Sequence, residues 1–274
     1  MSSSHTSFTG SIPEDYDTYL GPLIFEFTAA DMSRRVASVV DGPARVLEVA
    51  CGTGISTRHL AHVLPVGSEI LATDLNEAML AHARKVNGAL PGVTYAQADA
   101  LDLPYADDEF DAVVCQFGIM FFPDKHKGME EMCRTLRPGG TLALNVWDSF
   151  EHNRAVGIVD AVIKGFFEQN PPRFLEVPFG QIDTDAGRSL FEAAGFRNVE
   201  IAKVNEAVEV TGHVVTARGF ITGNPTILEI NQRATVSAED VVTAATIALE
   251  NEFGPAPAHL DFQATVFLGT KDDG

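Results

Sequence analysis

The stretch of sequence that decides the fold reads ARVLEVACGTG over residues 44–54. Its first half is mostly apolar, and in its second half Gly52 and Gly54 stand two positions apart. An apolar run that ends at closely spaced glycines predicts a buried parallel strand followed by a tight turn. Because glycine has no Cβ, a ligand can approach the backbone of such a turn closely. A helix expected at 55–64 aims its free N–H groups at the same place, which favours a small-molecule cradle.

The same turn also has a purely structural explanation. A Gly-x-Gly turn after a strand can serve only to pack a helix against a sheet. Both explanations remain open on this motif alone.

Composition and charge limit the possible partners. The chain has 274 residues, which predicts one or two domains, and 45% of them are hydrophobic, as in ordinary globular proteins. No apolar run has membrane-spanning length, so we expect no membrane partner. The formal net charge of −19 repels polyanions. We therefore expect a small-molecule substrate and no nucleic-acid partner, and the choice between a monomer and a homodimer stays open.

The cysteines indicate the compartment. Cys51, Cys115 and Cys133 lie far apart, with no Cys-x-x-Cys pair, which disfavours both a disulfide framework and a zinc site. Residues 1–5 lack the pattern of a signal peptide. We therefore expect a cytoplasmic protein without a bound metal.

Acidic residues follow the next two predicted strands. A strand at 69–73 ends in Asp74, twenty residues after Gly54, where open α/β folds hold ribose hydroxyls. Asp74 could instead cap the helix expected at 76–86, but the spacing favours the ribose role. A third strand at 93–97 is followed by Asp99, whose carboxylate or neighbouring backbone could meet an adenine amino group.

Strands and helices continue to alternate after this point. A fourth strand is expected at 112–115 and a fifth at 141–146. Between them, a helix with one apolar face stops at 137–140. Five alternations predict an α/β fold with a doubly wound, mostly parallel sheet. The apolar face of that helix consists of Met129, Met132, Cys133 and Leu136, which we interpret as core.

Five short motifs together resemble the class I S-adenosylmethionine-dependent methyltransferases. The resemblance is greatest to the small-molecule branch similar to the ubiquinone/menaquinone-biosynthesis methyltransferases, and it covers residues 16–147 well. It implies a seven-stranded, Rossmann-like methyltransferase sheet with S-adenosyl-L-methionine as cofactor. Each motif alone is weak, but five in the right order are specific. The motifs are VLEVACGTG at 46–54, ATDL at 72–75, ADA at 98–100, FDAV at 110–113 and LRPGG at 136–140.

The resemblance also implies roles for individual residues. Asp74 would hold the ribose hydroxyls, with Leu75 against adenine, and Asp99 would bind the adenine amino group, with backbone from Ala100. The backbone at Cys51 and Gly52 would border the methionine and ribose parts. Further cofactor-binding candidates are Glu48 toward the amino group, Gly54 in the glycine turn, the carbonyl of Gln116 toward the ammonium, and Tyr16 or Tyr19 closing over the cofactor.

Two other classes of function remain as alternatives. An NAD(P)-dependent oxidoreductase would have Gly or Ala at the third position of its glycine motif, which here is Thr57, and no counterpart of LRPGG. A non-catalytic cofactor-binding protein would keep the fold without the reaction.

A catalytic base is needed only if the acceptor must lose a proton. His126, His152 and His213 are the candidates, with His152 and His213 retained as weak ones, and for each an exposed surface role is favoured over catalysis. His59 and His62 share one side of a helix without a third ligand, so we interpret them as structural.

The second half of the chain is expected to determine specificity. We predict an N-terminal helical arm or lid at 1–40, a cofactor-binding core at 41–150, and the rest of the sheet with helical lid insertions at 151–274, all in one structural domain. The arm either caps the sheet edge or covers a ligand. We expect methyl transfer, to oxygen or nitrogen, on an aromatic or hydrophobic small molecule. The candidate substrate pocket consists of Phe25, Phe117, Phe121, Trp147 and Phe179; the alternative is that these aromatics only join lid to sheet.

Overall fold

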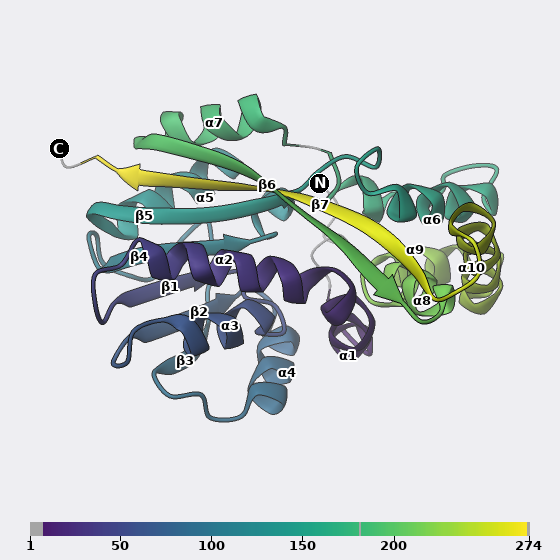
Figure 1. The fold of residues 1–274 in the computed structure, drawn as a ribbon, viewed down its shortest axis with the longest axis horizontal. Coiled ribbons are helices and arrows are strands. Elements are labelled where there is room, and N and C mark those ends of the chain that lie inside the picture. Colours follow the sequence, from purple (N-terminus) through teal and green to yellow (C-terminus); the bar gives the residue numbers. More distant parts are fainter. Residues whose placement is uncertain (1–7, 181, 273–274) are drawn as a thin grey trace. The chain divides into compact units, whose positions relative to one another are not determined.

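The computed structural model describes residues 8–180 and 182–272, so the N-terminal residues 1–5 lie outside the described part. A seven-stranded sheet has the order β3-β2-β1-β4-β5-β7-β6 (Figure 1). Strands β3, β2, β1, β4 and β5 pair in parallel, and β7 runs antiparallel to β5. This confirms the predicted mostly parallel, Rossmann-like sheet. The strands are β1 (Arg45–Val49), β2 (Glu69–Asp74), β3 (Val93–Gln97), β4 (Phe110–Gln116), β5 (Leu136–Trp147), β6 (Phe196–Val210) and β7 (Ala258–Lys271).

The chain forms two compact units. The first, called the helical unit here, comprises the described residues 8–25, 148–180 and 205–263. The second, called the sheet unit, comprises 26–147, 182–204 and 264–272. The helices are α1 (Ile12–Asp15), η1 (Tyr16–Phe25), α2 (Glu26–Ser38), α3 (Ile55–Val63), α4 (Glu77–Asn87), η2 (Ile119–Phe121), α5 (Lys125–Thr135), α6 (Arg154–Gly165), η3 (Phe174–Glu176), α7 (Thr184–Ala193), α8 (His213–Thr222), α9 (Thr226–Arg233) and α10 (Ala238–Phe253).

One face of the parallel strands packs against α2, α3 and α4. Alternate residues of a strand point to the same face, so Val46 of β1 and Val114 of β4 share a core with Met32 and Leu60. All four side chains are fully buried. The sequence motif at 44–54 therefore lies in a strand that is packed on its neighbours, as its apolar run predicts.

The opposite face of the sheet unit carries α5 and α7. Phe267 of β7 stacks on Phe191 of α7 with ring centroids 5.8 Å apart. Gly187 of α7 allows this packing, because a Cβ there would lie 2.3 Å from the Phe267 ring. Helices on both faces make the sheet doubly wound, as predicted.

The N-terminal arm is helical from Ile12 to Ser38. We expected a helical arm at 1–40; within it α2 begins at Glu26, and η1 before it is a π-helix of ten residues. Within the helical unit, η1 packs against α8, where a Cβ at Gly219 would lie 2.9 Å from Leu20 Cδ2. Tyr16 and Phe25, at the two ends of η1, stack with centroids 4.6 Å apart.

Several predicted boundaries were wrong. The LRPGG motif, expected to separate helix from strand, lies inside β5, because Leu136 already pairs with Phe110 before the register shifts. The strands expected at 112–115 and 141–146 are both longer, at Phe110–Gln116 and Leu136–Trp147. None of the described helices is long and apolar enough to cross a lipid bilayer.

Candidate functional site

The residues predicted to bind a cofactor cluster where the parallel strands end. The register places Val49 at the end of β1 level with Thr73 in β2, and Gln116 at the end of β4 level with Asn145 in β5. Parallel strands present their carboxyl ends at one edge of a sheet. The segments after β1, β2, β3 and β4 therefore meet at that edge, within the sheet unit.

The glycine turn after β1 has a left-handed backbone. Ala50, Gly52 and Gly54 have φ angles of 57°, 57° and 79°. The Cys51 N–H donates to the Thr73 carbonyl at 2.9 Å, which fixes the turn to β2. Helix α3 begins directly afterwards with no side-chain cap at its N-cap, so its first N–H groups face the turn. This backbone suits an anionic or strongly polar ligand group.

The two glycines of the turn have different surroundings. A Cβ at Gly52 would meet one described atom within 4 Å, Met79 Cε at 3.5 Å, which is an ordinary contact. A Cβ at Gly54 would lie 2.4 Å from Asn87 Nδ2 and 3.0 Å from the Tyr95 hydroxyl. The expectation that both glycines leave room for a ligand is therefore corrected for Gly54, where the protein's own side chains fill that space.

Asp74 joins the glycine turn to the end of β2. Its Oδ2 accepts a hydrogen bond from the Gly52 N–H at 2.9 Å, and its Oδ1 accepts one from the Asn76 N–H at 2.8 Å. The carboxyl group is 8% exposed, and burial raises its pKa, opposed by the backbone N–H donors. The N-cap of α4 is Asn76, so the alternative role of Asp74 as the helix cap is not observed. Each carboxylate oxygen retains a lone pair for a further donor.

Glu48 lies inside the sheet beneath the turn. Its side chain is buried, and Oε2 accepts a hydrogen bond from Thr57 Oγ1 at 2.6 Å. Oε1 is buried and has no hydrogen-bond partner among the described residues. Burial raises the pKa of Glu48 to about 7, although the hydrogen bond from Thr57 lowers it. Thr57 was noticed in the sequence only as a mismatch to the dehydrogenase motif, and the structure shows that it holds this carboxyl.

The thiol of nearby Cys51 is harder to ionise than an exposed one. Cys51 is buried in the turn, and desolvation raises the pKa of its thiol, as do the neighbouring carboxyls of Glu48 and Asp74. A protonated thiol is a poor nucleophile. Cys51 therefore contributes its backbone and its volume to this edge.

The segment after β3 presents an exposed polar wall. Asp99 is exposed, and its Oδ1 accepts a hydrogen bond from the Leu101 N–H at 2.9 Å. The Ala98 N–H donates to the Asp74 carbonyl at 3.2 Å. This bond ties the residue before Asp99 to the last residue of β2. Leu75 is 50% exposed, and Ala100 is half-buried.

The end of β4 is strained and aromatic. Phe117 has a φ of 56°, which costs a bulky residue of the order of 1–3 kcal/mol. Its N–H donates to the Asn145 backbone carbonyl at 3.2 Å and to Oδ1 at 2.9 Å. Its ring stacks on Trp147, with centroids 4.1 Å apart. Gln116 Oε1 and Asn145 Nδ2 are buried without a hydrogen-bond partner in the described structure.

Asn145 was missed by the sequence analysis. It is a fully buried amide in the middle of an apolar strand, LALNVW at 142–147. A polar residue at a core position of a buried strand is a signal that could have identified it.

The remaining candidates in the sheet unit are peripheral. Phe121 is half-buried at the end of η2. His126 lies in the first turn of α5 and is exposed, in line with the surface role favoured for it. His59 Nε2 contacts Glu26 Oε2 at 2.6 Å, and His62 Nδ1 contacts a backbone carbonyl. The described residues contain no group of three or more His, Cys, Asp or Glu arranged to hold a metal.

Six candidates belong to the helical unit and are described within it. Tyr16 and Tyr19 lie in η1 with Phe25, and Phe179 contacts Phe150 and Phe220 with centroids 5.7 and 6.4 Å apart. Their roles toward the sheet edge stay predictions. The other two candidates in this unit, His152 and His213, differ sharply from each other.

His152 is exposed, whereas His213 is buried. The side chain of His152 is 48% exposed, with Nδ1 3.2 Å from Ser149 Oγ and 3.6 Å from Asp148 Oδ1. His213 is 4% exposed, and its Nε2 lies 2.8 Å from the Gly254 carbonyl. Since a carbonyl only accepts, Nε2 carries the proton, and in the neutral ring Nδ1 is a buried acceptor without a partner in the described chain. The surface role favoured for His213 was wrong.

Comparisons with known proteins agree with this geometry. The family model "Methyltransferase domain" matches residues 47–144, which run from β1 into β5. The methyltransferase GfsG of Streptomyces halstedii is 33% identical over 174 residues, covering 62% of this chain and 59% of that protein. A demethylmenaquinone methyltransferase of Deinococcus radiodurans is 39% identical over 144 residues, covering 51% of this chain and 58% of that protein. The chain thus matches less than two thirds of the length of either relative.

A solved structure extends the likeness in fold. Phosphoethanolamine N-methyltransferase 2 of Haemonchus contortus, in complex with S-adenosyl-L-methionine, covers 99% of this chain with a TM-score of 0.61 and 18% sequence identity. This chain covers 60% of that structure. Residues 47–144 of the protein therefore match the methyltransferase-domain model, and the chain resembles the class I S-adenosylmethionine-dependent methyltransferases of the ubiquinone/menaquinone-biosynthesis branch.

Proposed function

We propose that the protein transfers the methyl group of S-adenosylmethionine to a small molecule. The observation that carries the proposal is the edge of the sheet, where Asp74 fixes the Gly52 backbone at 2.9 Å while keeping acceptor capacity. That arrangement suits a ribose diol, because a vicinal diol offers two donors to one carboxylate. Relatives that are named methyltransferases over the same stretch support the same conclusion.

The residues present fit this cofactor. Buried acceptors normally have partners, and Glu48 Oε1 and Gln116 Oε1 have none in the described chain. The ammonium of the methionine part offers donors of the kind that both oxygens lack. We propose that Glu48 and Gln116 accept hydrogen bonds from this ammonium, Gln116 through its backbone carbonyl as the resemblance implies and also through its side-chain oxygen. We also propose that Asp74 holds the ribose, and that Leu75, Asp99 and Ala100 bind adenine. Cys51, Gly52 and Gly54 would contribute turn backbone, and Tyr16 or Tyr19 would close over the cofactor.

The chemistry asks the chain mainly to bind, orient and exclude water. The bound cofactor supplies an electrophilic methyl carbon on a sulfonium. An acceptor atom held in line with it at near-attack distance reacts without further activation if it already has a free lone pair. We propose that the stacked rings of Phe117 and Trp147 form an apolar wall that keeps water from this place.

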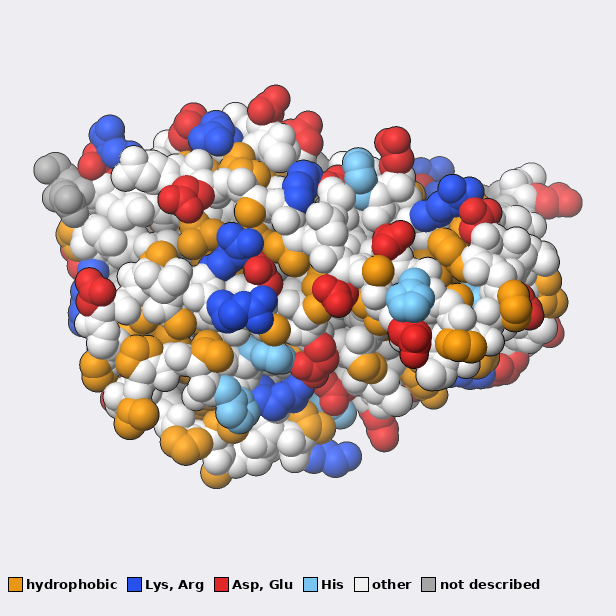
Figure 2. Space-filling model, viewed as in Figure 1, with side chains coloured by type: hydrophobic (Ala, Val, Ile, Leu, Met, Phe, Trp, Pro, Cys, Tyr) orange, Lys and Arg blue, Asp and Glu red, His pale blue; other side chains and the backbone are white. Residues whose placement is uncertain are grey.

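A small, aromatic or hydrophobic acceptor fits these surroundings better than a polyanion. The net charge is −19, and on the face drawn in Figure 2 acidic and basic side chains lie among one another and among uncharged ones. Phe25, Phe121 and Phe179 are the further pocket residues that we propose. We propose oxygen or nitrogen as the acceptor atom. A hydroxyl would need a base, for which His152 and His213 are the candidates.

Thermal unfolding with two ligands tests the proposal. S-adenosylhomocysteine at 100 times its Kd stabilises a protein that binds it by about 2.7 kcal/mol. We expect a rise in Tm with S-adenosylhomocysteine and none with NADH at the same concentration. A rise with NADH alone would instead favour the oxidoreductase.

A further inference from the structure

Asp99 and Ala100, which we propose to bind adenine, lie in a connection that contains no helix. Residues 98–109 join β3 to β4, and they contain an isolated bridge between Asp99 and Asp102 but no helix. Most connections between parallel strands contain a helix, which satisfies its own backbone groups. The polar backbone groups of 98–109 must therefore find partners elsewhere.

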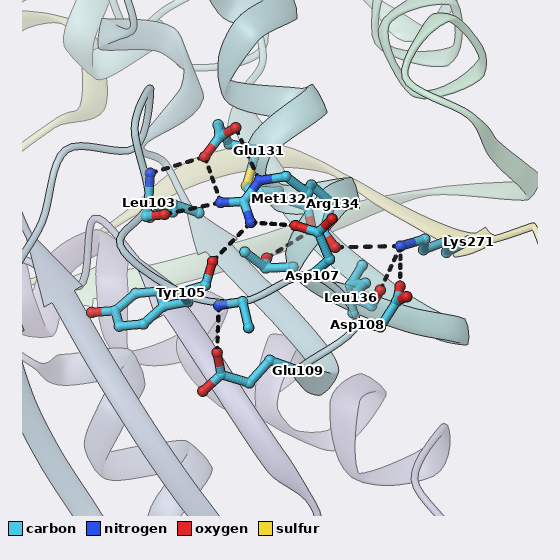
Figure 3. Close-up of polar contacts among 12 residues, drawn as sticks. Leu103, Tyr105, Asp107, Asp108, Glu109, Glu131, Met132, Arg134, Leu136 and Lys271 are labelled. Carbon is cyan, nitrogen blue, oxygen red and sulfur yellow. Dashed lines mark hydrogen bonds and ion pairs between the residues drawn. The ribbon is translucent and has the colours of Figure 1, made fainter.

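Helix α5 supplies the partners of Leu103 and Tyr105 in the middle of the connection through one pair of side chains, Glu131 and Arg134 (Figure 3). Glu131 Oε2 accepts a hydrogen bond from the Leu103 N–H at 3.0 Å. The Arg134 guanidinium donates to the Leu103 carbonyl at 2.9 Å and to the Tyr105 carbonyl at 2.8 Å. It also donates to Asp107 Oδ1 at 2.7 Å.

The pair is built as one unit. Arg134 Nη2 donates to Glu131 Oε2 at 2.8 Å, and Nε donates to Oε1 at 3.2 Å, a bidentate arrangement of the strong kind. The Glu131 side chain is 8% exposed. The hydrogen bonds from Arg134, with help from Lys127 and the Leu103 N–H, lower the pKa of Glu131 to about 2.

The end of the connection next to β4 is held by the last turn of α5 and by Lys271 of β7. The Asp108 N–H donates to the Arg134 carbonyl at 3.0 Å, and the Glu109 N–H donates to the Thr135 carbonyl at 2.9 Å. Lys271 of β7 donates to Asp108 Oδ1 at 2.6 Å and to the Leu136 carbonyl at 2.7 Å (Figure 3). The connection is thus fastened at its middle by side chains and at its end by the last turn of α5.

Two backbone hydrogen bonds lie between the middle of the connection, at Leu103, and the edge of the sheet. The Asp102 N–H donates to the Asp99 carbonyl at 3.0 Å, and the Ala98 N–H donates to the Asp74 carbonyl at 3.2 Å. Leu103, next to Asp102, is 3% exposed, so the middle of the connection is anchored in the core. The position of the Asp99 carboxylate therefore depends on groups that lie well away from it in sequence.

We propose that Glu131 and Arg134 are positioning residues for adenine recognition. They hold the connection at Leu103 and Tyr105 so that Asp99 stands where it accepts a hydrogen bond from the adenine amino group. This inference rests on the function proposed above, because it assumes that Asp99 faces the adenine of the cofactor. Neither Glu131 nor Arg134 touches the cofactor.

Binding calorimetry with two ligands tests the inference. The first ligand is S-adenosylhomocysteine, and the second is S-inosylhomocysteine, in which oxygen replaces the adenine amino group. We expect Arg134→Gln to raise the Kd of S-adenosylhomocysteine about tenfold, the loss of about one hydrogen bond to a charged group. For S-inosylhomocysteine the same substitution should change Kd by less than about threefold, because the contact is already missing.

A second arginine provides the matched control. Arg137 lies three residues after Arg134 and pairs with Asp111 of β4, and no contact of its side chain with 98–109 is observed in the described structure. Arg137→Gln should leave both Kd values unchanged. Arg134→Lys keeps one charged donor and should give an intermediate Kd, and it replaces Arg134→Gln if that variant does not fold.

The outcomes separate the inference from the proposed function. If the wild-type protein binds S-adenosylhomocysteine and the Arg134 variants bind it equally well, the positioning role is wrong and the proposed function stands. Equal weakening of both ligands would also overturn the inference, because a merely structural role predicts no dependence on the amino group. If the folded wild-type protein binds neither ligand, the proposed function fails as well.

Discussion

The carboxyl edge of the sheet unit and the interior of the helical unit handle polar groups in different ways. At the edge, Glu48 and Gln116 keep buried oxygens without partners among the described residues. In the helical unit, the buried amide of Asn153 is fully used: it donates to three backbone carbonyls and accepts from the Gln263 N–H at 3.0 Å. The helical unit also has an acceptor that is unmet in the described chain, His213 Nδ1, so a missing partner does not by itself mark a ligand site. The edge differs because its two unmet oxygens lie where the parallel strands end, beside the glycine turn, and this favours it as the place of the proposed cofactor.

Asp74→Ala should give the largest effect and would break this comparison if it did not. We expect the Kd of S-adenosylhomocysteine to rise roughly 100-fold, because two hydrogen bonds to a charged carboxylate are lost. The structure adds a smaller loss of stability, since the Gly52 N–H loses its acceptor. Calorimetry gives Kd, and circular dichroism verifies that the fold is retained. Unchanged affinity would refute the ribose role of Asp74.

The buried carboxyl of Glu48 should make stability depend on pH. Its pKa of about 7 exceeds the unfolded value of 4.5, so between these values the native state binds more protons than the unfolded state. The contribution of Glu48 to stability is thus greatest below pH 4.5 and falls as the pH rises through 7, by about 3 kcal/mol in total. Urea unfolding between pH 5 and 8.5 should show this decline in the wild-type protein and a flatter profile in Glu48→Gln.

Glu131→Gln is the control for that profile. The pKa of Glu131 is lowered to about 2, so its contribution is present above pH 4.5 and is lost only as the pH falls from there toward 2. The difference in stability between Glu131→Gln and the wild-type protein should therefore stay constant from pH 6 to 8.5. A Glu48→Gln profile as steep as the wild-type one would contradict the assignment to Glu48.

Alanine substitution of the two glycines should affect stability and cofactor affinity in opposite order: Gly54 matters more for stability, and Gly52 matters more for affinity. Gly54→Ala adds a left-handed alanine whose Cβ lies 2.4 Å from Asn87 Nδ2, so we expect a loss of about 2–3 kcal/mol in unfolding free energy. Gly52→Ala adds the same strain without a clash and should cost about 1 kcal/mol, but it should weaken S-adenosylhomocysteine binding more. Equal effects in both measurements would show that the glycines have the same role.

Histidines of the helical unit should give the smallest effects on the cofactor. His213→Ala removes a buried hydrogen bond to Gly254 and should lower stability by about 1–2 kcal/mol without changing the Kd of S-adenosylhomocysteine. His152→Ala, at an exposed position, should change stability by less than about 0.5 kcal/mol. A clear loss of cofactor affinity in either variant would show that the helical unit also contributes to cofactor binding.

The sequence predicted the sheet unit well because its signals are local. A run of apolar residues, a glycine turn and an acid twenty residues later each have a fixed place in a parallel sheet, so the ends of β2 and β3 were placed to within a residue. The order of five such motifs also predicted the family resemblance. What these signals left out is the partner of each polar group, such as Thr57 on Glu48.

The missed features depend on contacts between residues far apart in sequence. Gly54 is surrounded by Asn87 and Tyr95, and β5 begins early because Leu136 pairs with Phe110. His213 appeared suited to the surface because a polar residue at a helix start usually is exposed, but Gly254 supplies its partner from 41 residues away. No pattern within a short window contains such information.

Titration of S-adenosylhomocysteine into the folded wild-type protein, followed by calorimetry, tests the central claim most directly. We predict a saturable heat with one site per chain, which Asp74→Ala largely abolishes. The absence of binding heat at several temperatures, in a sample whose fold is verified, would contradict the assignment of a nucleoside-bearing cofactor to the edge of this sheet.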